Sequence, residues 1–214
     1  MKNNLMFRWL YLILGVVSML FAGIIYGWSI INAPFTHFWD ASQLALNFTI
    51  TMTCFCLGGF LGAKLSKKFG IFISITISGL LSTAGFLLAS RLDGSNVILL
   101  YLTYGVLAGL GIGIAYNAVI STVNAWFPDR KGLCSGALMM GFGASSLVIG
   151  NLMSSLMDSM GWEKAYMLLG GALGAVLVIT ALVLRKPDEN TVLPAPKVKK
   201  AAKEEAFEAK DYST

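Results

Sequence analysis

The stretch NAWFPDRKG, residues 124–132, decides between two fold classes for this chain. Its charged cluster, Asp129 to Lys131, follows a run from Gly94 to Pro128 that carries no formal charge, and a second uncharged run begins directly after it. It is either a surface loop of a soluble protein or a short turn between two membrane helices. Composition favours the membrane, because 56% of the 214 residues are hydrophobic and 13% charged, against about 45–50% and about 25% in globular proteins.

The uncharged segments are long enough to cross hydrocarbon, which requires about 20 residues of helix. We therefore predict an all-α membrane protein in which residues 1–186 form a six-helix transmembrane domain. The predicted helices span approximately residues 9–33, 42–65, 70–90, 96–126, 131–157 and 163–185. Residues 187–214 hold three of the five prolines and many charges, which predicts a polar cytoplasmic tail or the start of a linker.

The distribution of basic residues predicts the orientation, because Lys and Arg are retained on the cytoplasmic side of a membrane. With an inside N-terminus, the two outside positions are Arg91 and Lys164. The nine inside positions before the tail are Lys2, Arg8, Lys64, Lys67, Lys68, Arg130, Lys131, Arg185 and Lys186. We therefore predict a multi-pass protein of the cell (inner or plasma) membrane with both termini in the cytoplasm. The net charge of +5 is largely this asymmetry plus the tail, and we predict no nucleic-acid partner.

Residues that carry chemistry are scarce. The only histidine, His37, lies in a predicted outside loop, and Cys54, Cys56 and Cys134 lie inside membrane segments without the spacing of a metal site. The sequence contains no H-E-x-x-H motif, no pair of intramembrane aspartates and no serine beside a histidine. We predict neither an enzyme nor a bound metal or cofactor.

An internal repeat relates the two halves of the chain. GIIYG at 23–27 resembles GIAYN at 113–117, and GFLGAKLSKKFG at 59–70 aligns with GNLMSSLMDSMG at 150–161. Tyr26 and Tyr116 are 90 positions apart. Because three helices separate the copies, the second copy is predicted to be inverted in the membrane, which is a transporter architecture. Chance similarity among glycine-rich apolar segments is the alternative.

Several of these stretches resemble one family. GLGIGIAYNAVISTVNAWFPDRKGLCSGALMMGFGASS, residues 109–146, resembles the fourth-to-fifth-helix region of the oxalate/formate antiporter branch of the major facilitator superfamily. IYGWS at 25–29 resembles that branch's first helix, Phe48-Thr49 its second, and GAKLSKKFG at 62–70 the superfamily's second-to-third-helix loop. The resemblance implies two inverted three-helix repeats that form the N-terminal half of a major-facilitator-type bundle.

The resemblance also implies which partners and loops matter. A complete carrier has twelve helices, so a second six-helix half is expected, from another chain or from a second copy of this one. The loops expected to act in conformational change contain Lys67, Lys68, Gly70, Asp129 and Arg130. The family's usual acidic residue falls at Lys67, which puts its usual cytoplasmic latch in doubt here.

The cavity wall is predicted to contain Tyr26, Trp28, Asn47, Phe48 and Tyr116. An aromatic pocket can enclose a flat carboxylate while a tyrosine hydroxyl donates to it. Simple packing between helices is the alternative for these aromatics. Two polar stripes leave the same choice open: they consist of Gln43, Asn47, Thr51 and Cys54, and of Asn117, Ser121 and Asn124.

The predicted function is transport of a small organic anion by alternating access, with an oxalate- or formate-type carboxylate as substrate and the lipid bilayer as surroundings. Every Lys and Arg lies at or near a helix end, although a carboxylate in hydrocarbon needs a cation or a cluster of donors. The resemblance implies that the second half supplies that cation. The alternative is a non-transporting truncated product or an interaction subunit that packs with another membrane protein.

Overall fold

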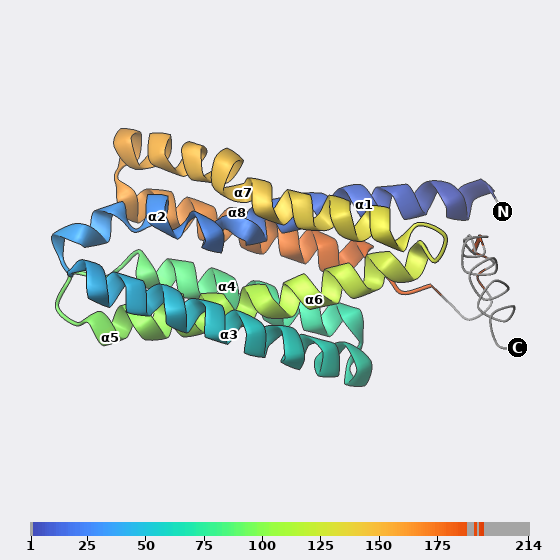
Figure 1. The fold of residues 1–214 in the computed structure, drawn as a ribbon, viewed down its shortest axis with the longest axis horizontal. Helices are drawn as coiled ribbons and strands as arrows, with labels where there is room; N and C mark the ends of the chain where they lie inside the picture. The colour runs from blue at the N-terminus through green and yellow to red at the C-terminus, as the bar shows by residue number, and fades with distance from the viewer. Residues whose placement is uncertain (1, 188–190, 192, 195–214) are drawn as a thin grey trace, which may run out of the picture.

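The structure is a computed structural model that describes residues 2–187, 191 and 193–194, with the backbone alone for residues 2–6. Over these residues it is a bundle of helices without a strand (Figure 1). Six spans are long and apolar enough to cross a membrane, as the uncharged segments predict. The predicted tail, 187–214, lies almost wholly outside the described residues.

The first three spans occupy the N-terminal half of the bundle. Span 1 contains α1 (Lys2–Ala22), the 3₁₀ helix η1 (Gly23–Gly27), α2 (Trp28–Ile31) and the 3₁₀ helix η2 (Ala33–His37). Spans 2 and 3 are α3 (Ala41–Lys68) and α4 (Gly70–Ala89).

The other three spans repeat this arrangement in the opposite sense across the membrane. Span 4 contains α5 (Val97–Leu100), the π-helix η3 (Tyr101–Ala108) and α6 (Gly109–Trp126). Spans 5 and 6 are α7 (Lys131–Met160) and α8 (Trp162–Val183).

Local sequence explains where several helices begin and end. The Asp40 carboxylate accepts a hydrogen bond from the Gln43 backbone N–H (2.9 Å), and Gln43 Oε1 accepts one from the Asp40 N–H, which together cap the start of α3. The α6 helix ends at Trp126, two residues before Pro128, which has no backbone N–H to continue it. Span 1 departs from the single predicted helix: it tightens to 3₁₀ geometry between Gly23 and Gly27 and again after Asn32.

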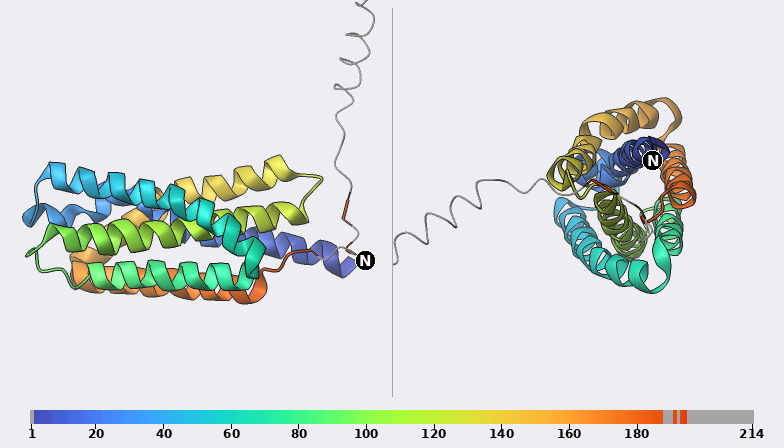
Figure 2. Two further views of the ribbon diagram at one scale, coloured as in Figure 1. Left: turned by 90° about the horizontal axis from the view of Figure 1, so that it is seen from below. Right: turned by 90° about the vertical axis from the view of Figure 1, so that its right-hand side faces the viewer.

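Helix pairing follows the inverted repeat. The α1 helix packs chiefly against α7, and α3 packs chiefly against α6, while α4 packs against α8. Exchanging spans 1–3 with spans 4–6 converts the first pair into the second and leaves the third unchanged. Figure 2 shows the consequence: α3 and α7 lie on one side of the bundle and α4 and α8 on the other.

Two turns also obey the repeat. Gly70 and Gly161 each lie at the start of the third span of their repeat, and their φ angles are 86° and 88°. Residues other than glycine rarely adopt this left-handed backbone conformation. The two turns therefore share a backbone geometry as well as an aligned glycine.

Two helix crossings at the centre of the bundle are equally close. A Cβ atom at Gly23 would meet the carbonyl oxygen of Phe142, and a Cβ atom at Gly113 would meet the carbonyl oxygen of Phe55. Gly23 and Gly113 are aligned in the repeat, and each brings its span against the backbone of another. Only glycine fits at either crossing without moving a helix.

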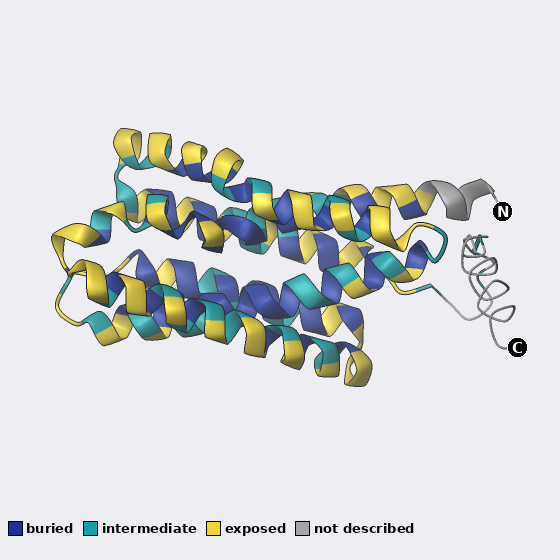
Figure 3. Cartoon of the chain, in the orientation of Figure 1, coloured by how far each residue is buried: buried dark blue, intermediate teal, exposed yellow. Residues whose placement is uncertain are grey.

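The surface of the bundle is apolar, as a lipid-facing surface requires. Large exposed side chains occur on every span, for example Leu80 (67% exposed), Leu147 (69%) and Leu182 (59%). Figure 3 shows exposed residues along the outward faces of α3 and α7.

Hydrogen bonds join the helices at both ends of the bundle. At the predicted outer end, the Tyr166 hydroxyl of α8 donates to the Ile31 carbonyl (2.6 Å). At the inner end, Trp126 Nε1 donates to the Arg185 carbonyl (2.6 Å) and Lys186 Nζ donates to the Ser66 carbonyl of α3 (3.3 Å). Spans 1, 2, 4 and 6 are thus tied to one another.

Candidate functional site

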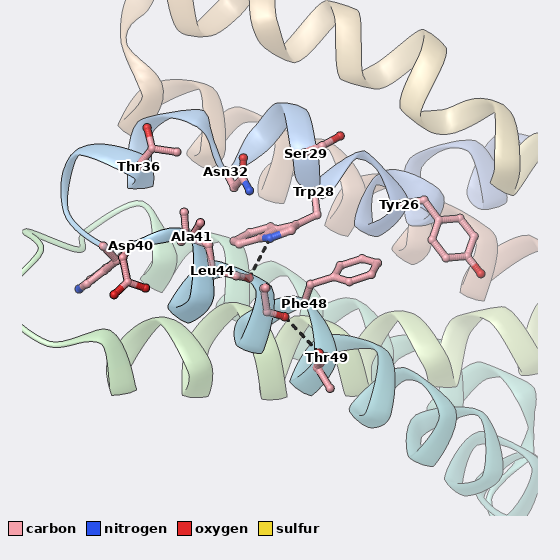
Figure 4. A pocket seen from close by; sticks show the side chains of 12 residues that line it. Tyr26, Trp28, Ser29, Asn32, Thr36, Asp40, Ala41, Leu44, Phe48 and Thr49 are labelled. Atoms are coloured by element: carbon pink, nitrogen blue, oxygen red, sulfur yellow. Dashed lines mark hydrogen bonds between the residues drawn. The ribbon is translucent and has the colours of Figure 1, made fainter.

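A groove of about 700 Å³ lies between the second half of span 1 and the first turns of α3 (Figure 4). Its α3 side consists of residues one and two turns apart, so one face of that helix forms the wall. The twelve lining residues are Tyr26, Trp28, Ser29, Asn32, Thr36, Trp39, Asp40, Ala41, Leu44, Ala45, Phe48 and Thr49. Three of the predicted wall residues, Tyr26, Trp28 and Phe48, are among them.

The Trp28 side chain is held in place in the groove wall by contacts on two sides. Its side chain is 5% exposed, and its Nε1 donates to the Leu44 carbonyl of α3 (3.1 Å). Its ring packs against Tyr104 of η3, with ring centroids 4.6 Å apart. Since the indole N–H is already bonded, Trp28 offers a ligand its ring surface and no donor.

Tyr26 and Phe48 face the groove from opposite walls (Figure 4). Tyr26 is 49% exposed, and its hydroxyl has no hydrogen-bond partner among the described residues. Phe48 is half-buried on α3. The two side chains therefore supply an apolar surface and one uncommitted donor.

Ser29, Asn32 and Thr36 also line the groove, although they are not among the predicted wall residues. Tyr26 of η1, Ser29 of α2 and Asn32 at the end of α2 are each three residues apart, a spacing that places them on one face of span 1. Within the described chain, no hydrogen bond engages the side chains of Ser29 and Asn32, whereas the Thr36 hydroxyl donates to the Ala33 carbonyl (2.7 Å). The spacing of three after the GIIYG motif was the available signal.

Tyr116 does not line the groove and belongs instead to a central aromatic cluster of Tyr26, Phe55, Tyr116 and Phe142. The rings of Tyr26 and Tyr116 both pack edge-on against Phe142, at centroid distances of 5.1 and 4.9 Å. Phe55 also contacts Tyr116, at 5.2 Å. The two tyrosines aligned by the repeat therefore meet around one phenylalanine, and Tyr26 belongs both to this cluster and to the groove.

Asn47 also lies away from the groove. It is fully buried, and its Oδ1 atom lies 3.2 Å from the position that a Cβ atom of Gly105 would occupy. The polar stripe of α3 thus faces span 4. In the other stripe, Asn124 Nδ2 donates to the Ser135 hydroxyl of α7 (2.7 Å). In this conformation these side chains of both stripes take part in helix contacts.

The charge of the groove is negative. Asp40 is the one charged residue among the twelve that line it. Hydrogen bonds from the Gln43 backbone N–H and from Ser42 hold the pKa of Asp40 below its ordinary value, so this carboxylate is ionised at neutral pH. The groove provides donors and aromatic surface to an anion but no positive charge.

The predicted conformational loops lie at the other end of the bundle. Asp129 accepts two hydrogen bonds from the Arg8 guanidinium, at 2.9 and 3.3 Å, and lies 3.5 Å from Arg130 Nε. The Arg8 and Asp129 side chains are only 6% and 10% exposed. The Arg8 guanidinium also lies over the Phe127 ring, 4.6 Å from its centroid. The first turns of α1 are therefore bound to the turn between spans 4 and 5.

Opposing effects set the pKa of Asp129. Burial raises this pKa. The hydrogen bond from Arg8, a backbone hydrogen bond and the charges of Arg8 and Arg130 lower it, and together they outweigh the effect of burial. The net pKa is below the ordinary value. The carboxylate is thus a stable anion held between two arginines.

Lys67 and Lys68 lie at the C-terminal end of α3, and Gly70 is the first residue of α4. Both lysines are exposed in the last turn of the helix, where positive charge is favourable beside the helix C-terminus. Lys68 Nζ lies 5.1 Å from the Phe69 ring centroid. No group of three potential metal ligands of the His, Cys, Asp or Glu type occurs within the described part of the chain.

The six spans form a multi-spanning membrane bundle of two inverted three-helix units, an architecture that occurs in many transporters. Residues 10–210 match the Major Facilitator Superfamily. The chain belongs to that superfamily.

Several curated members of the superfamily are similar to this chain. The chain is 32% identical over 181 residues to the uncharacterized MFS-type transporter YhjX of Escherichia coli (strain K12), covering 84% of this chain and 44% of the relative. It is 32% identical over 186 residues to the oxalate:formate antiporter of Oxalobacter formigenes, covering 86% and 44%. It is 31% identical over 180 residues to monocarboxylate transporter 12 of Mus musculus, covering 81% and 36%. The chain thus spans less than half the length of these relatives, which are transporters.

Proposed function

We propose that this chain forms one six-helix half of a carrier that moves a small carboxylate, of the oxalate or formate type, across the cell membrane by alternating access. The observation that carries the proposal is the groove: aromatic walls, uncommitted donors at Tyr26, Ser29 and Asn32, and no cation. Relatives named for oxalate, formate and monocarboxylates support the substrate class. The chain acts as a carrier and not as an enzyme.

A second six-helix half completes the site in this proposal. A carboxylate that enters hydrocarbon without a counter-charge costs several kcal/mol, and the groove's own charged residue, Asp40, is negative. The partner half therefore supplies the cation, while Tyr26, Trp28 and Phe48 enclose the apolar faces of the substrate. Tyr116 joins this wall when the groove extends inward to the central aromatic cluster. The loops containing Lys67, Lys68, Gly70, Asp129 and Arg130 lie at the inner contact between the halves.

The test is uptake of labelled oxalate and formate into vesicles that contain this chain alone or together with a candidate second half. We expect uptake above that of empty vesicles when both halves are present. If neither preparation exceeds empty vesicles for either anion, the carboxylate proposal fails, and a subunit that only packs with other membrane proteins is favoured.

Tyr26→Phe tests the donor in the groove. A hydrogen bond to a charged group contributes about 1.5–3 kcal/mol, so we expect substrate affinity to fall about tenfold to a hundredfold. Competition between labelled and unlabelled substrate measures it. Tyr11→Phe is the matched control, because Tyr11 packs against Trp126 at the inner end of the bundle. Equal affinities of Tyr26→Phe and the unchanged protein would remove Tyr26 from the site.

The proposed orientation has its own test. In sealed right-side-out vesicles, a membrane-impermeant amine reagent should label Lys164 directly and label Lys67 and Lys131 only after permeabilisation. All three lysines are exposed, so accessibility within the fold does not bias the comparison. Labelling of Lys67 or Lys131 from outside would reverse the proposed orientation.

A further inference from the structure

The amide of Asn47 has no hydrogen-bond partner in the described part of the chain. Both Oδ1 and Nδ2 are buried and unpaired, and the residue as a whole is 0% exposed. Its own backbone carbonyl accepts from the Thr51 hydroxyl (2.8 Å), so the α3 backbone is satisfied while the amide is not. Buried polar groups in native proteins are nearly always paired with protein, water or an ion.

The surface opposite this amide is unusual. Asn47 packs against Gly105, which lies in the π-helix η3. A π turn contains one residue more than an α turn, so the backbone ladder cannot run unbroken through its two junctions with α5 and α6. Such segments are rare and occur mostly at functional sites. A second polar group of η3, the Tyr104 hydroxyl, is also buried without a partner.

We propose that Asn47 and the π segment form a buried water-binding site between spans 2 and 4. The amide can donate two hydrogen bonds and accept others, and the interrupted backbone ladder of η3 supplies further polar groups. Water is the ligand that fits, because a buried water needs only two to four polar partners. Asn47 and Tyr104 are both neutral, and the described residues include no cluster of three His, Cys, Asp or Glu side chains that could hold a metal cation.

The proposed water site would affect how span 4 moves against span 1, whichever substrate is transported. Tyr104 of η3 packs directly against Trp28, the fixed wall of the groove. If η3 changes between π and α geometry, its residues rotate about the span 4 axis and Tyr104 moves relative to Trp28. Bound water can exchange hydrogen bonds during that change, whereas a direct side-chain bond would hold one geometry.

Hydroxyl-radical footprinting of the full chain in lipid nanodiscs tests the site, because X-ray radiolysis of a bound water oxidises the side chains around it. We expect oxidation at Tyr104 itself, although its side chain is fully buried. We expect Asn47→Leu to reduce that oxidation several-fold. Asn151→Leu is the matched control, because Asn151 is exposed on α7 and bonds within its own helix.

A second variant keeps the test decisive if Asn47→Leu does not fold. In Gly105→Ala, the new methyl group would lie 3.2 Å from Asn47 Oδ1 and 3.0 Å from Ile50, so it would take up space beside the amide, and we expect the same loss of oxidation. Absence of oxidation in the unchanged protein would overturn the proposal. Oxidation that is equal in the unchanged protein and in both variants would overturn it as well.

Discussion

Gly113→Val is expected to separate spans 2 and 4 and to prevent the bundle from assembling in its native form. A Cβ atom at position 113 would meet the Phe55 carbonyl oxygen, and a backbone atom cannot move aside as a side chain can. Overpacking costs about 1–3 kcal/mol and occasionally more. We expect a loss of about 3 kcal/mol or more at this backbone contact. Thermal unfolding and size-exclusion chromatography in detergent measure the effect.

The repeat supplies an internal comparison for this result. Gly23→Val should cause a similar loss, because its Cβ atom would meet the Phe142 carbonyl oxygen at the equivalent crossing. Gly143→Val is the control, since nothing lies within 4 Å of a Cβ atom there. If Gly113→Val unfolds at the same temperature as Gly143→Val, the close crossing described here is absent.

Arg8→Ala is expected to have the second-largest effect. Removing one partner of a buried ion pair leaves an unpaired charge and typically costs about 3–5 kcal/mol, and we expect about 3 kcal/mol because this pair lies at the end of the bundle. Arg130→Ala provides the matched control. Arg130 contacts the same carboxylate, but its side chain is 47% exposed, and exposed pairs contribute about 1 kcal/mol or less.

A double-mutant cycle separates the ion pair from packing. Arg8→Ala, Asp129→Ala and the double variant should show a coupling that accounts for most of the single-variant loss, because the two groups are in direct contact. A coupling near zero would mean that Arg8 stabilises the turn only through its contact with the Phe127 ring.

The pH dependence of stability follows from the lowered pKa of Asp129. A carboxyl group whose folded-state pKa is depressed stabilises the fold above its unfolded-state pKa, about 3.9 for aspartate. This stabilisation is lost as the pH falls through the lower, folded-state value. The difference in unfolding free energy between the unchanged protein and Asp129→Asn should therefore be constant from neutral pH to about 5 and shrink below about 4. A difference that already shrinks near neutral pH would contradict an anionic, arginine-bound Asp129.

The large-scale fold was predictable because the membrane spans correspond directly to long apolar runs along the sequence. Six uncharged segments give six spans, and charged clusters such as the one at Asp129 mark the turns. The repeat was predictable from Tyr26 and Tyr116, which the structure places around Phe142. These features depend on local sequence and on spacing alone.

The details of the site depend on which helix faces which, and the sequence does not contain that information directly. A polar stripe places Asn47 on one face of α3, but only the packing of α3 against span 4 decides that the face points away from the groove. Ser29 and Asn32 were not predicted, because only the packing of span 1 beside α3 decides which face of span 1 lines the groove. Arg8 and Asp129 are 121 positions apart, so no local pattern could pair them.

The hydrogen bonds that join the two ends of the bundle affect how such a half can move. At one end of the bundle, Tyr166 joins span 6 to span 1. At the other end, the indole of Trp126 joins span 4 to Arg185, directly after span 6. Helices joined at both ends of the bundle tilt together as one rigid body. A displacement of the helix ends on one side of the membrane then produces an opposite displacement of the helix ends on the other side. In the proposed carrier, the site would then open and close chiefly at the seam with its partner.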